Sequence, residues 1–132
     1  MTEEEATALG KRLAACRHFR PMPGLKDMQG RTWDDSLLWR WNPAVDVPDL
    51  RQPASMGILL ALVREAWRCP TVYVRQSTTR RVSDGVIAWE VCDLYLDAEA
   101  CRALGVPREG SVRSWGYASE AEALVAALEA AP

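Results

Sequence analysis

The segment that most constrains the fold is an apolar stretch that opens with a proline. Pro53 has the backbone angle of a first helical turn, and apolar residues then recur every three or four positions as far as Trp67. So wide an apolar face predicts a central helix over residues 53–67, covered by a sheet. The apolar positions are Met56, Leu59, Leu60, Val63 and Trp67, widened by Ile58 and Leu62.

The clearest β signal follows directly after this helix. Pro70 ends the helix, and residues 71–81 have the composition of a strand. The turn at residues 83–85, Ser-Asp-Gly, sends the chain back through the apolar residues 86–92. We therefore predict a β-hairpin over residues 71–92.

Two more helices are predicted near the ends of the sequence. Thr2 and Glu5 form a capping box, and the apolar spacing after them indicates a helix to about Arg17. Ser119 and Glu122 cap a last helix in the same way. The remaining predicted elements are short: strands at 28–33 and 37–41, which could pair as a hairpin, a helix at 97–104, and a strand at 112–117.

Together these elements predict one domain over residues 1–132. At 132 residues, 48 % of them apolar, the chain can build one core and has no room for a second. Strands joined by tight turns, with helices at both ends, predict an α+β fold. We expect a small, mostly antiparallel sheet of four to five strands, packed by two to three helices.

The charge balance and the first residues of the sequence indicate where the protein is located and which partners it has. The 16 basic and 18 acidic residues nearly balance, so the chain as a whole has no attraction for DNA or anionic lipid. The first residues are acidic, unlike a secretory leader, and the longest apolar run, residues 56–63, is too short to span a bilayer. We expect a cytoplasmic protein without a membrane partner.

The residues that catalysis or metal binding would need are sparse. His18 is the only histidine, and a surface position near a helix end explains it. The glycines match no phosphate-binding motif, and the cysteines are too far apart for a zinc site or a disulfide framework. We predict no enzyme, no cofactor and no metal site. A small hydrolase or metal enzyme is a minor hypothesis built on His18, on Cys16, Cys69, Cys92 and Cys101, or on the acidic pairs Asp34 with Asp35, Asp46 with Asp49, and Glu90 with Asp93.

Six tryptophans against one phenylalanine are unusual for this length. Trp39 and Trp41 flank Arg40, and on a strand both rings would leave the same face. Large aromatic residues are core material first. Tryptophan and arginine also dominate the energetic centres of protein interfaces, so residues 39–41 are a candidate contact surface. A homodimer through this strand is a further expectation, because an uncovered strand edge invites pairing.

A second candidate is a basic run with one acidic residue, Glu65, among its arginines. A solvated surface explains such a run most simply. The functional alternative is a nucleic-acid-binding module whose arginines contact phosphates and whose tryptophan stacks on bases. The run comprises Arg64, Arg68, Arg75, Arg80 and Arg81, of which Arg75, Arg80 and Arg81 are the candidate contacts.

Several packing segments resemble a group of uncharacterised small proteins of bacteriophages and prophages of proteobacteria. The resemblance covers residues 48–50, 53–67 and 119–132 and the Met22-Pro23-Gly24 turn. It implies a phage accessory protein that acts inside an infected bacterium by binding a host macromolecule, in the first place a protein, as anti-CRISPR and other anti-defence proteins do. It implies no catalytic residue.

Overall fold

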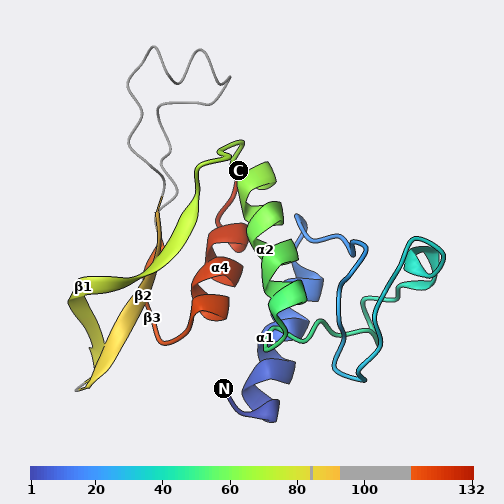
Figure 1. Ribbon diagram of the computed structural model, residues 1–132, viewed down its shortest axis with the longest axis horizontal. Helices are drawn as coiled ribbons and strands as arrows, with labels where there is room; N and C mark the ends of the chain where they lie inside the picture. Colours follow the sequence, from blue (N-terminus) through green and yellow to red (C-terminus); the bar gives the residue numbers. More distant parts are fainter. Residues whose placement is uncertain (84, 93–113) are drawn as a thin grey trace.

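The computed structural model describes residues 1–83, 85–92 and 114–132, and it confirms the predicted α+β fold (Figure 1). The predicted helix at 97–104 lies outside these residues, as do Asp84, Asp93 and Cys101. The elements are α1 (Glu3–Ala15), the 3₁₀ turn η1 (Leu38–Arg40), α2 (Pro53–Ala66), β1 (Tyr73–Ser83), β2 (Val86–Cys92), β3 (Ser114–Tyr117) and α4 (Glu120–Glu129).

The described strands form an antiparallel sheet in the order β1-β2-β3. The predicted hairpin is confirmed, with Tyr73 opposite Cys92 and Gln76 opposite Trp89. β3 pairs with the other edge of β2, where Ser114 lies opposite Val91. β2 is therefore the central strand of the three.

The helices cover one face of this sheet, and α4 lies between the sheet and α2 (Figure 1). The prediction that the sheet itself covers α2 is wrong in this respect. α4 presents small buried residues on several sides, Ala121, Ala123 and Ala127 among them, so it can pack closely against both the sheet and α2. Leu59 and Val63 of α2 are fully buried in the resulting core.

The predicted helix starts are also confirmed. The Thr2 hydroxyl accepts a hydrogen bond from the Glu5 backbone N–H (3.1 Å), and the Glu5 carboxylate accepts one from the Thr2 N–H (2.8 Å). The Ser119 hydroxyl accepts a hydrogen bond from the Glu122 N–H at 3.2 Å. None of the helices in the described residues is long and apolar enough to cross a membrane.

The predicted hairpin of residues 28–33 and 37–41 is wrong. Residues 16–52 form an irregular connection with two isolated bridges, Lys26 to Thr32 and Asp27 to Pro48. The Asp34 carboxylate accepts hydrogen bonds from the backbone N–H groups of Ser36 (3.0 Å) and Leu37 (3.1 Å). This local turn starts η1, so residues 37–41 never extend into a strand.

Candidate protein-binding surface

A buried carboxylate organises the connection between α1 and α2. Asp27 is only 2 % exposed. Its Oδ2 accepts hydrogen bonds from the Trp33 indole N–H (2.9 Å) and from Arg31 Nε (2.8 Å), and its Oδ1 accepts from the backbone N–H groups of Gln29 (3.0 Å) and Arg31 (2.9 Å). Burial alone would raise the pKa of this carboxyl group, but the hydrogen bonds outweigh burial and lower its pKa.

Arg31 joins this carboxylate to the distal half of the connection. Its Nη2 donates to Asp46 Oδ1 at 2.7 Å, while the Asn42 backbone N–H donates to Asp46 Oδ2 at 2.7 Å. The Ser55 hydroxyl ties the same connection to α2, because it accepts from the Lys26 N–H (3.1 Å) and donates to the Lys26 carbonyl (3.0 Å). These hydrogen bonds hold the irregular connection in one conformation and attach it to α2.

The pairing of Asp46 with Asp49 as an acid–base or metal pair is not what the structure shows. Asp49 binds Arg51 through both of its oxygens (2.9 and 3.0 Å), and Asp46 binds Arg31. Asp46 and Asp49 thus bind different arginines, and Arg31 also binds Asp27. Within residues 1–83, 85–92 and 114–132, no three His, Cys, Asp or Glu side chains gather into a group that could hold a metal ion.

This connection places the two candidate tryptophans in opposite environments. The Trp41 ring packs 5.0 Å from the Trp33 ring and 5.7 Å from the Phe19 ring, measured between centroids. Trp39 is 80 % exposed. The prediction that both rings share one strand face is wrong, because residues two apart in a 3₁₀ turn point in different directions.

Trp39 is nevertheless held in place. Its indole N–H donates to the Ser36 carbonyl at 2.8 Å, and the Arg40 guanidinium lies 5.8 Å from the centre of its ring. The exposure continues along the chain to Val45, which is 60 % exposed. We call residues 39–45 the 39–45 segment; its exposed members are Trp39, Arg40, Asn42, Pro43, Ala44 and Val45.

The comparisons with known proteins identify no relative. No family model, no curated protein and no solved structure matches the chain. The comparisons therefore assign no function to the chain.

Two arginines of the basic run are already engaged within the described part of the protein. Arg64 Nε donates to the Val72 carbonyl at 2.8 Å, and Arg75 forms an ion pair with Glu90 at 2.7 Å. Arg68 follows the C-terminal end of α2, whereas Arg81 is exposed and lies two residues before the end of β1. The Arg80 side chain lies outside the described part of the structure.

His18 and the described cysteines form no catalytic group. His18 Nε2 lies 3.1 Å from the Ala131 carbonyl and 3.2 Å from Arg17 Nε. Cys69 Sγ lies 3.3 Å from the Thr71 hydroxyl, and Cys16, Cys69 and Cys92 are free thiols. These contacts place His18 next to Arg17 and the Ala131 carbonyl, just beyond the end of α4.

The two tryptophans should respond differently to truncation. We expect Trp39→Ala to change the free energy of unfolding by less than about 0.5 kcal/mol, since its ring is exposed. Trp41→Ala should lower the free energy of unfolding by about 2 kcal/mol, because it removes a half-buried ring from two aromatic contacts. Urea denaturation followed by circular dichroism measures both. Equal losses of stability would show that Trp39 is a packing residue.

Proposed function

We propose that this chain is a non-enzymatic binding protein whose partner is another protein, contacted through Trp39 and Arg40 of the 39–45 segment. The observation that carries the proposal is the 80 % exposure of a tryptophan that its own hydrogen bond holds in place. Burial of a large aromatic ring in an interface contributes a large favourable free energy of binding. A ring that is already oriented loses little entropy when a partner covers it.

The neighbourhood of Trp39 also fits a protein interface. Arg40 lies over its ring, and Pro43, Ala44 and Val45 add exposed apolar surface along the same segment. Tryptophan and arginine surrounded by small apolar contacts are typical of interface hot spots. A nucleic-acid site has weaker support, since Arg75 is already paired with Glu90 and Arg64 donates to the Val72 carbonyl.

The identity of the partner is part of the proposal. The resemblance to small phage and prophage proteins supports a host protein in the bacterial cytoplasm as the partner, with the chain acting as an accessory protein of the anti-defence type. A protein of this type would block a host factor by binding to its surface, which requires no catalytic group.

Capture of the partner from bacterial lysate tests this proposal. The tagged wild-type chain, Trp39→Ala and the control Lys11→Ala, which changes an exposed residue of α1, are compared with and without nuclease. We expect one protein to survive nuclease and to bind Trp39→Ala at least about 30-fold more weakly than the control. Capture that nuclease abolishes, or that ignores Trp39, contradicts the proposal.

A further inference from the structure

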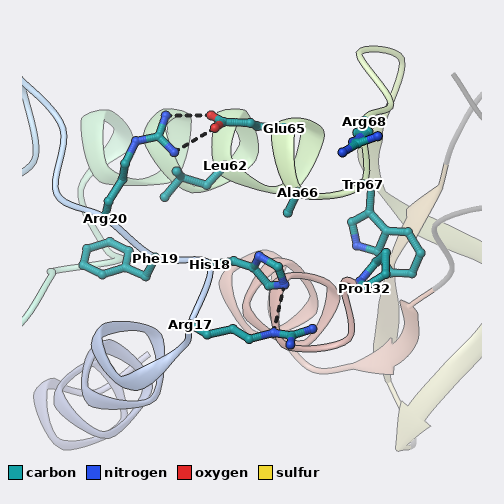
Figure 2. A pocket seen from close by; sticks show the side chains of 10 residues that line it. All are labelled: Arg17, His18, Phe19, Arg20, Leu62, Glu65, Ala66, Trp67, Arg68 and Pro132. Atoms are coloured by element: carbon teal, nitrogen blue, oxygen red, sulfur yellow. Dashed lines mark hydrogen bonds and ion pairs between the residues drawn. The ribbon is translucent and has the colours of Figure 1, made fainter. Parts of the chain in front are cut away.

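Two tryptophans differ in what their indole hydrogen bonds connect. The Trp67 indole N–H donates to the Ala127 carbonyl at 2.8 Å and so joins α2 to α4, beside the open cleft drawn in Figure 2. The Trp39 indole N–H donates, also at 2.8 Å, to the carbonyl of Ser36, only three residues earlier in the chain. The Trp67 ring is packed against the core, whereas the Trp39 ring is exposed. The bond of Trp39 therefore sets the direction of an exposed ring and joins no distant elements.

Asp34 fixes the carbonyl group that Trp39 uses. Its Oδ1 accepts hydrogen bonds from the Ser36 backbone N–H (3.0 Å), the Ser36 hydroxyl (2.6 Å) and the Leu37 backbone N–H (3.1 Å). The Ser36 carbonyl and the Leu37 N–H belong to one planar peptide group and point in opposite directions. Asp34 thus binds one side of the peptide group whose other side accepts the Trp39 indole N–H.

The turn has a second set of bonds that does not involve the carboxylate. The Asp34 backbone carbonyl accepts hydrogen bonds from the Leu37 and Leu38 N–H groups, both at 3.0 Å. The two leucines are half-buried, whereas Asp34, Ser36 and Trp39 are exposed. The turn can therefore form without the carboxylate, whose own bonds add order to the exposed residues.

We propose that Asp34 is a positioning residue for the binding of the protein partner: through the Ser36 peptide group it holds the Trp39 ring, in the free chain, in the orientation that the partner contacts. The inference rests on the proposed function and adds the residue that prepares its contact. Ordering a side chain on binding lowers the affinity, so a ring that is ordered beforehand binds more tightly. Asp34 has this effect without touching the partner.

The first test measures the free chain. The rate at which the Trp39 indole proton exchanges with water is followed by ¹H–¹⁵N NMR, with the signal assigned by its loss in Trp39→Ala. We expect exchange to be about threefold faster in Asp34→Ala, because the hydrogen bond to Ser36 is less well held. Asp34→Asn keeps a side-chain oxygen that can accept the same bonds and should exchange as wild type does.

Asp35→Ala is the matched control for charge. It removes a carboxylate from the neighbouring exposed residue and should leave the exchange rate of the Trp39 indole proton unchanged. The melting temperatures of all three variants at positions 34 and 35 should lie within about 2 °C of wild type, since these substitutions are on the surface.

The second test measures binding by capture from bacterial lysate with the tagged chains at graded concentrations. Asp34→Ala should need about three to ten times the wild-type concentration to capture the same amount of the protein that wild type captures, because the ring must now be ordered on binding. Asp34→Asn and Asp35→Ala should capture it as wild type does.

The outcomes separate this inference from the proposed function. Unchanged indole exchange in Asp34→Ala overturns the inference, and so do equal losses of capture in Asp34→Ala and Asp35→Ala, which would assign the effect to charge. If Trp39→Ala loses capture while Asp34→Ala captures normally, the inference fails and the proposed function stands. If Trp39→Ala captures as wild type does, the proposed function fails and the inference fails with it.

Discussion

We expect Asp27→Ala to lower the free energy of unfolding by about 3 kcal/mol. The substitution leaves the buried Trp33 indole N–H and the Gln29 and Arg31 backbone N–H groups without their acceptor. It also removes one of the two carboxylates that hold the Arg31 guanidinium. Breaking such a network costs more than a typical hydrogen bond, because its buried donors stay unsatisfied. Urea denaturation monitored by tryptophan fluorescence measures the loss.

Two comparisons check this explanation. Asp34→Ala removes an exposed carboxylate that serves only its own turn, and it should cost much less stability. The pKa of Asp27 lies below its ordinary value of 3.8 in the folded protein. Its contribution to stability is therefore fully present above that ordinary value and is lost as the pH falls through the lowered one. Asp27→Asn should flatten this acid dependence; an unchanged dependence would assign it to other carboxylates.

We expect Gly10→Ala to lower the free energy of unfolding by about 2–3 kcal/mol. A β-carbon at Gly10 would lie 2.3 Å from the Pro48 carbonyl oxygen and 2.7 Å from Val47 Cγ1. Both contacts are shorter than van der Waals distance, so α1 and the connection would have to move apart. Thermal unfolding followed by circular dichroism measures the effect.

Gly57→Ala is the matched control, since it makes the same change inside α2. No atom lies within 4 Å of a β-carbon at Gly57. Alanine is the better helix former, so this variant should be more stable than wild type by about 0.5–1 kcal/mol. If both variants lost stability, the close approach of α1 to Pro48 would not be the cause.

The helices and the hairpin could be predicted because their signals are local. The capping residues Thr2 and Ser119 stand next to the helices they start, and the apolar stripe of α2 repeats within a few residues. Gly85 of the predicted turn likewise lies between β1 and β2. Such signals do not depend on how distant parts of the chain meet.

The connection could not be predicted, because its structure depends on contacts between distant polar residues. Asp27 and Asp46 are 19 positions apart, and Arg31 binds both of them. A sequence pattern does not reveal which carboxylate is buried. The aromatic residues at 33, 39 and 41 have the composition of a strand when the contacts of Arg31 with Asp27 and Asp46 are not known. The sequence alone therefore does not show that Trp39 is exposed and Trp41 is packed.

The prediction for Arg68 concerns only its charge, as a member of the basic run. The sequence also contains a local signal for its backbone conformation. α2 ends with Pro70 close behind it and without a glycine in residues 67–70. A helix that must close before a proline often places one residue in the left-handed region. Since no glycine was available there, another residue type had to adopt that conformation, and Arg68 does so.

The common direction of α1, α2 and α4 has a consequence for how the sequence of this protein can vary. Because α1 and α2 finish at the same end (Figure 1), the chain must travel the length of α2 again before that helix can start. The 14 residues of α2 are about 21 Å long, a distance that six or seven extended residues can cover. Residues 16–52 far exceed this minimum. The surplus carries the 39–45 segment, so the sequence and length of this segment can change while the helices and the sheet stay as they are.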